Sequence, residues 1–267
     1  MTSVLFEKIE ERLYILFSLF GYNSLYAKIY KKRGFNLEMI NKEALIYSVL
    51  AVLLMGYVFS LEKITFSYFL LSSLMAIAIL VVNFGAKKLS ASLFDCNISL
   101  NLWTLKRFGF AKSRHFKNPL PMWVIFPLVL AWASAGVLQW IAVTVFDASP
   151  SHVALRRRYS EISEWELALM AVSGSFANIL LALILQAFSL HEFAMFSALF
   201  AVLSLVPFGQ LDGTKVFFGS RMLWIFSILL SLIVYILLGI TNVTATIIAA
   251  VLIAVIGVVL YYIFREA

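Results

Sequence analysis

Long apolar stretches dominate the sequence and constrain its fold more than any other feature. They cover residues 45–61, 64–85, 119–146, 165–190, 193–209, 222–240 and 243–264. A membrane-spanning helix needs about 20 consecutive apolar residues, and in lipid the backbone polar groups must pair within the helix itself. We therefore expect an all-α polytopic membrane protein, and we expect it in the cell membrane as an integral, multi-pass protein.

The composition excludes a soluble globular enzyme. Hydrophobic residues make up 63% of the chain and charged residues only 13%, whereas soluble domains carry about 25% charged residues. The net charge of +7 is typical of basic cytoplasmic loops, so we expect the lipid bilayer as a partner and no nucleic acid. A single cysteine, Cys96, excludes an intramolecular disulfide.

The chain divides into two regions by pattern. Residues 4–22 mix charge with Leu, Ile and Phe, which is typical of an amphipathic helix that lies on a membrane. Residues 1–43 are accordingly predicted to be an interfacial N-terminal segment. Residues 44–267 contain no Gly/Ser linker and no repeat, which indicates a single membrane domain.

The stretch 119–146 is longer than one crossing requires, and it contains three prolines that interrupt helical hydrogen bonding. It is predicted either to cross once as a straight helix or to turn back as a re-entrant or interfacial hairpin. A single crossing divides the 21 Lys and Arg residues 14 to 7 between the two sides, whereas a hairpin leaves only Lys63 outside. Because basic residues concentrate in cytoplasmic loops, we expect about six crossings plus a hairpin, with both termini cytoplasmic.

Two segments carry polar residues at regular positions near or within apolar helices. The sequence SLVPFGQLDG covers residues 204–213, and VSGSFANILLAL covers residues 172–183. They resemble the Asn-x-x-Pro-x-x-x-Leu-Asp-Gly and Gly-Pro-x-x-Asn motifs of site-2 proteases, a family of intramembrane zinc metalloproteases. The matching residues are Gly174, Asn178, Pro207, Leu211, Asp212 and Gly213, while Ser175 and Ser204 replace the family's Pro and Asn.

The resemblance covers approximately residues 60–220, because the order and spacing of the two motifs also match. The stretch NISLNLWTL, residues 97–105, is similar to the short strand region of archaeal members. The resemblance therefore implies a site-2 protease-like core of archaeal type, with a short β region near residues 97–110.

The family's first motif, His-Glu-x-x-His, is missing. Two His residues at i and i+4 bind zinc from one helix face, with the Glu as general base, and in this family the Asp of Leu-Asp-Gly is the third ligand. Asn83, Phe84 and Lys87 stand at the corresponding positions, and no His occurs between Met1 and Arg114. We therefore expect no catalytic residue, no metal ligand set and no zinc cofactor.

The three histidines leave one alternative open. His191 precedes Glu192 in a short connection predicted to lie on the outer face, while His115 and His152 are predicted in loops on the side of Asp212. An active metalloprotease with ligands recruited from His115 or His152 is the second hypothesis. A small transporter or channel is the third, although the sequence has no inverted repeat.

The first hypothesis is a pseudoprotease, a catalytically inactive site-2 protease-like protein that binds or regulates membrane clients. Its partners would be transmembrane or extended peptide segments of membrane proteins. A buried carboxylate needs a partner, so Asp212 is predicted to pair with Lys87 or Lys215, or alternatively to cap the following turn and face water. Asn178 is predicted to make an interhelical hydrogen bond or to contact a ligand, and the three arginines at 156–158 to meet anionic lipid headgroups.

Overall fold

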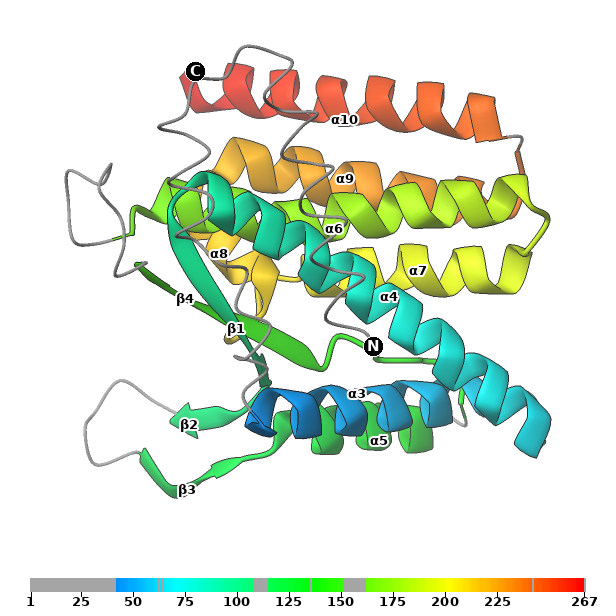
Figure 1. The fold of residues 1–267 in the computed structure, drawn as a ribbon. Coiled ribbons are helices and arrows are strands. Elements are labelled where there is room, and N and C mark those ends of the chain that lie inside the picture. Colours follow the sequence, from blue (N-terminus) through cyan, green and yellow to red (C-terminus); the bar gives the residue numbers. More distant parts are fainter. Residues whose placement is uncertain are drawn as a thin grey trace, which may run out of the picture. The chain divides into compact units, whose positions relative to one another are not determined.

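Helices make up most of the computed structural model, and six of them coincide with six of the predicted apolar stretches (Figure 1). The structure describes residues 42–61, 63, 65–107, 115–134, 136–150, 162–241 and 243–266. The six helices are α3 (Lys42–Ser60), α4 (Phe66–Leu93), α6 (Glu164–Ala187), α7 (His191–Ser204), α9 (Arg221–Leu237) and α10 (Val243–Glu266).

Three of these helices, α4, α6 and α10, are long and apolar enough to cross a membrane. The helices α7 and α9 and residues 46–60 of α3 are apolar but shorter. Large aliphatic side chains such as Ile248, Leu252 and Ile256 on α10 are exposed. Such surface is unfavourable in water and suited to lipid, so the helices indicate a membrane protein.

Polar residues at the helix starts show why the helices begin where they do. Ser163 and Glu166 form a reciprocal capping box at the start of α6. The side chains of Thr65 and Ser220 accept hydrogen bonds from backbone amides in the first turns of α4 and α9. These hydroxyl and carboxylate oxygens satisfy amides that have no partner within the helix.

Helix α6 is the centre of the helical arrangement. It packs against α4, α7 and α9, and against the short helix α8 (Asp212–Gly219) that follows α7. Figure 1 shows α6, α7, α9 and α10 side by side, with α4 crossing in front of them. The start of α8 and the middle of α6 are thereby brought to α4.

Four short strands accompany the helices in the described part of the chain, and two of them, β3 and β4, lie outside the predicted β region. Strand β1 (Cys96–Leu102) pairs antiparallel with β4 (Thr144–Pro150), and β2 (Leu105–Arg107) pairs with β3 (His115–Leu120). The β region predicted near residues 97–110 is therefore present as β1 and β2.

The segment 119–146 turns back on itself. Its helix α5 (Met122–Ala133) has 12 residues, or about 18 Å at 1.5 Å per residue, too short for one crossing of about 30 Å. The backbone of Trp103 accepts a hydrogen bond from the Trp123 amide and donates one to the Val143 carbonyl, both 3.0 Å long. Both ends of the segment therefore meet at one residue, which contradicts the straight helix and agrees with the hairpin.

Helix α4 is longer than the apolar stretch 64–85 predicts, because it continues to Leu93. Lys87 and Lys88 lie within the helix, one buried and one exposed. The apolar pattern ends near Lys87, whose charge is neutralised by Asp212 in the folded protein. The change in composition therefore does not mark the end of the helix.

Contacts divide the chain into two units, residues 1–43 and residues 44–267. The predicted amphipathic helix at 4–22, His152 and the arginines at 156–158 lie outside the described residues.

Candidate functional site

The site begins at the contact between α4 and α6. Asn83 and Lys87 are one turn apart on α4, and both side chains are buried. A Cβ atom at Gly174 of α6 would lie 2.5 Å from Lys87 Cε and 2.7 Å from Asn83 Nδ2. The absence of a side chain at position 174 therefore leaves room for the ends of the Lys87 and Asn83 side chains.

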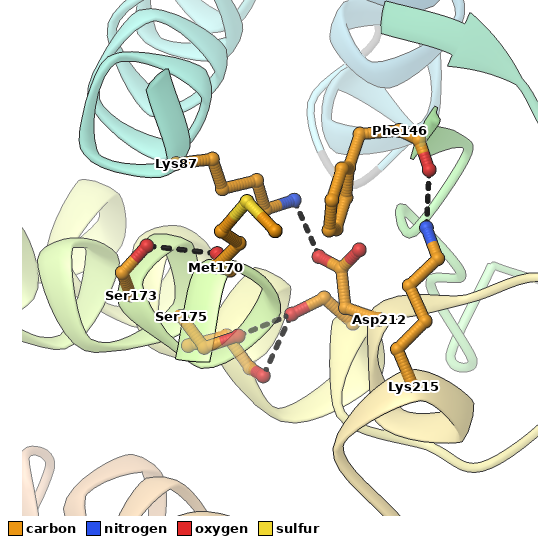
Figure 2. Close-up of polar contacts among 9 residues, drawn as sticks. Lys87, Phe146, Met170, Ser173, Ser175, Asp212 and Lys215 are labelled. Carbon is orange, nitrogen blue, oxygen red and sulfur yellow. Dashed lines mark hydrogen bonds and ion pairs between the residues drawn. The ribbon is translucent and has the colours of Figure 1, made fainter. Parts of the chain in front are cut away.

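Lys87 forms a buried ion pair with Asp212, the first residue of α8 (Figure 2). The side chains are only 4% and 2% exposed, respectively. The predicted pairing of Asp212 with Lys87 is confirmed, and the alternative in which Asp212 faces water is wrong. A carboxylate in the first turn of a helix also interacts favourably with the helix dipole.

A second lysine borders the pair without bonding to Asp212. The ammonium group of Lys215 donates a hydrogen bond to the Phe146 carbonyl and lies 3.6 Å from the centre of the Phe146 ring. The Lys87 ammonium lies 5.1 Å from the same ring centre. Phe146 of β4 therefore contacts both lysines (Figure 2), a role that nothing in the sequence pattern indicates.

Burial lowers the pKa of Lys215 from 10.5 to about 8. The positive charge of Lys87 acts in the same direction, while the negative charges of Asp212 and Asp147 oppose it. Lys215 lies on α8, outside the long apolar helices. The charges of Lys87 and Asp212 therefore both act on Lys215.

The turn before α8 fixes the position of Asp212. Leu211 is fully buried, and a Cβ atom at Gly213 would lie 2.0 Å from the Leu205 carbonyl oxygen. Only glycine allows α8 to start this close to the end of α7. Each residue of the Leu-Asp-Gly sequence therefore has a structural role. Leu211 packs in the apolar interior, Asp212 carries the paired carboxylate, and Gly213 allows the close backbone approach.

The two serines that depart from the family motifs bond to each other. The hydroxyl groups of Ser175 and Ser204 are 2.9 Å apart, and both residues are buried. Ser204 donates to the Ala201 carbonyl at 3.0 Å, so Ser175 is the donor between the two. In the sequence, Ser175 and Ser204 are two separate departures from the motifs. In the structure, they form one hydrogen-bonded contact between α6 and α7.

Several buried polar atoms at and near the site have no hydrogen-bond partner among the described residues. They are Asn83 Nδ2, both side-chain polar atoms of Asn178, Asp212 Oδ1 and Thr214 Oγ1. No described residue makes the interhelical hydrogen bond predicted for the Asn178 side chain. Instead, its backbone carbonyl accepts a hydrogen bond of 2.8 Å from Ser197. Unpartnered buried groups are costly, and these can bind water or another polar group.

These residues do not fit zinc. The Asp212 carboxylate is already bound by an ammonium group, the neutral amide of Asn83 is a weak ligand, and a protonated lysine repels a divalent cation. Among the described residues, no group of three His, Cys, Asp or Glu side chains is arranged to hold a metal ion. The site as folded is an ion pair.

His191 and Glu192 lie away from this group of residues. His191 is the first residue of α7, with Nδ1 3.1 Å from Gln186 Oε1, about 20 Å along that helix from Ser204. Glu192 accepts hydrogen bonds from Lys63 at 2.5 Å and from the Tyr68 hydroxyl at 3.0 Å. His115 is the first residue of β3. His191 was predicted in a short connection and is instead helical.

Comparison with known proteins adds no assignment: no protein-family model, no curated protein and no solved structure matches this chain.

Proposed function

We propose that this protein is a non-catalytic membrane protein with a site-2 protease-like core, a pseudoprotease that binds or regulates membrane clients. The observation that carries the proposal is the buried Lys87–Asp212 ion pair. By the resemblance, these positions correspond to the second His of the first motif and to the third zinc ligand. An ammonium group on this carboxylate takes the place that a metal ion takes in active enzymes.

The contacts around the pair support the alignment on which the proposal rests. Asn83 and Lys87, spaced as the two His ligands would be, both face Gly174 of the Gly-x-x-x-Asn segment. Lys87 also reaches Asp212 of the Leu-Asp-Gly segment. Three segments far apart in the sequence therefore meet where the resemblance implies one site.

The proposed topology has about six crossings, with both termini cytoplasmic and the segment 119–146 re-entrant or interfacial. The return of that segment to Trp103 supports it, since a hairpin leaves only Lys63 among the basic residues outside. The proposed partners are the bilayer and transmembrane or extended peptide segments. The side-chain polar atoms of Asn83 and Asn178 that have no hydrogen-bond partner among the described residues support a binding role. The backbone amides and carbonyls of a bound peptide can form hydrogen bonds with them.

The absence of catalysis is tested on the full chain reconstituted in liposomes. Labelled transmembrane peptides are incubated with the wild-type protein and with an Asp212→Ala variant, with and without a zinc chelator. An active intramembrane metalloprotease assayed in parallel is the positive control. We expect no chelator-sensitive cleavage of the peptides by either protein. Chelator-sensitive cleavage that is lost in the Asp212 variant would instead establish the active metalloprotease.

Client binding is tested with a photoreactive transmembrane peptide of defined sequence in the same liposomes. We expect crosslinks concentrated on the parts of α4 and α6 around Asn83 and Asn178. Crosslinks spread evenly over lipid-facing positions of α10, such as Ile248 and Leu252, would contradict a specific binding role.

A further inference from the structure

A hollow lies apart from the Lys87–Asp212 pair, where α8 ends, α9 begins and α10 nears its end. Its volume is about 390 Å³, and its lining residues are Phe218, Gly219, Ser220, Arg221, Met222 and Tyr261. None of these residues is acidic, and one of them carries a permanent positive charge. The hollow therefore favours an anionic ligand.

The position of the cation is defined by its neighbours. Arg221 is the exposed first residue of α9, and its guanidinium carbon lies 5.7 Å from the centre of the Phe217 ring. Contact with an aromatic face restrains a guanidinium group while leaving its N–H donors available. The planar group can then bind two phosphate oxygens at once.

The surroundings of the hollow are those of a membrane boundary. The apolar helix α9 starts at Arg221, and the apolar helix α10 passes the hollow at Tyr261. The Phe218 side chain is 68% exposed, and tyrosines are enriched where helices leave the hydrocarbon layer. A ligand here would meet the Arg221 cation and, beside it, apolar surface of α9 and α10.

We propose that this hollow binds the phosphodiester headgroup of an anionic phospholipid, with Arg221 contacting the phosphate and the acyl chains lying along α9 and α10. Basic hollows between membrane helices suit such headgroups. Free phosphate has the same charge chemistry, but it makes no use of the apolar surface. The proposal requires only that α9 and α10 lie in a membrane, and it is independent of the role proposed for Lys87 and Asp212.

The test is native mass spectrometry of the detergent-purified full chain, titrated with phosphatidylglycerol or phosphatidylcholine. We expect phosphatidylglycerol to be retained preferentially. An Arg221→Gln variant should bind it about fivefold more weakly, the effect of one basic residue at a membrane surface. Met222→Trp should also weaken binding, because it fills the hollow without changing the charge.

Lys88→Gln is the matched control, since it removes one exposed positive charge outside the hollow, and it should leave the preference unchanged. Thermal melting of each variant verifies folding. Equal retention of the two lipids, or equal effects of Arg221→Gln and Lys88→Gln, would overturn the proposal. Inorganic phosphate that competes as well as the lipid would also overturn it, in favour of a soluble ligand.

Discussion

At the residue scale, the buried pair of Lys87 and Asp212 explains why two charged side chains are tolerated inside an apolar protein. Either charge alone would be buried without compensation, and together they neutralise each other. The pair need not be worth more than apolar packing. What the arrangement requires is that both charges be present or both be absent.

This dependence predicts strong coupling between the two residues. Lys87→Met or Asp212→Leu alone should lower the free energy of unfolding by about 3–5 kcal/mol, because each leaves an unpaired buried charge. The double variant should lose much less than the sum. Reversible unfolding in mixed micelles measures all four corners of this double-mutant cycle.

The exposed pair of Lys63 and Glu192 is the control, with side chains 53% and 49% exposed. Lys63→Met and Glu192→Leu should each cost at most about 1 kcal/mol, with little coupling. Additive losses at Lys87 and Asp212, as at an exposed pair, would refute the dependence.

Lys215 predicts a pH dependence of stability. Its pKa is about 8 in the folded protein against 10.5 ordinarily, so between these values the unfolded chain binds more protons at this site. The free energy of unfolding should therefore rise with pH across that interval. Below pH 8 both states are protonated, and the contribution is constant.

The measurement is the free energy of unfolding of the wild type and of Lys215→Met from pH 7 to 10.5. Taking the difference between the two proteins at each pH cancels the titration of the other groups. We expect this difference to shift in favour of the wild type above pH 8. A difference that stays flat through this interval would show that Lys215 is not buried as described.

At the element scale, the side chains of Lys87 and Asn83 on α4 occupy the space next to Gly174 of α6 that a side chain at 174 would fill. Gly174→Ala should destabilise the protein by about 1–3 kcal/mol, because the new methyl group would lie 2.5 Å from Lys87 Cε and 2.7 Å from Asn83 Nδ2. Gly85 is the matched control on α4, since a Cβ there meets nothing within 4 Å. Gly85→Ala should stabilise by up to about 1 kcal/mol, through helix propensity.

Thermal unfolding in one detergent compares the two glycine variants. Opposite signs are expected. Equal effects of the two substitutions would mean that the Lys87 and Asn83 side chains do not pack against Gly174.

The helices could be predicted from the sequence because lipid allows few alternatives to long apolar helices. The return of segment 119–146 could also be predicted, since a hairpin gives the more uneven distribution of basic residues. The end of α4 could not, because Lys87 is charged in sequence but neutralised by Asp212 in the fold. The strand β4 was missed, since its first three residues, 144–146, were included in the longest apolar stretch.

At the scale of the whole molecule, segments of α4, α6 and α8 meet at one buried point. The sequence predicts the meeting of Lys87 and Asp212 through the motif resemblance. It does not predict the contact of Phe146 with both lysines or the bond between Ser175 and Ser204. Both depend on which side chains the packed helices and β4 bring together, and neither leaves a periodic pattern in the sequence.

The site geometry predicts that a zinc site can be introduced with few changes. Asn83→His with Lys87→His places two imidazole groups one turn apart on α4 and frees the Asp212 carboxylate, which completes three ligands. The matched control is Val81→His with Gly85→His, a pair of the same spacing on a surface with an exposed Val81 and open space around Gly85.

The most direct measurement is the zinc content of these proteins, purified without a metal-binding tag, by elemental mass spectrometry. We predict zinc well below one ion per chain in the wild type and in the control pair. We predict about one ion per chain in Asn83→His/Lys87→His, lost again when Asp212→Asn is added. About one zinc ion per chain in the wild type, or none in a folded Asn83→His/Lys87→His protein, would contradict the account.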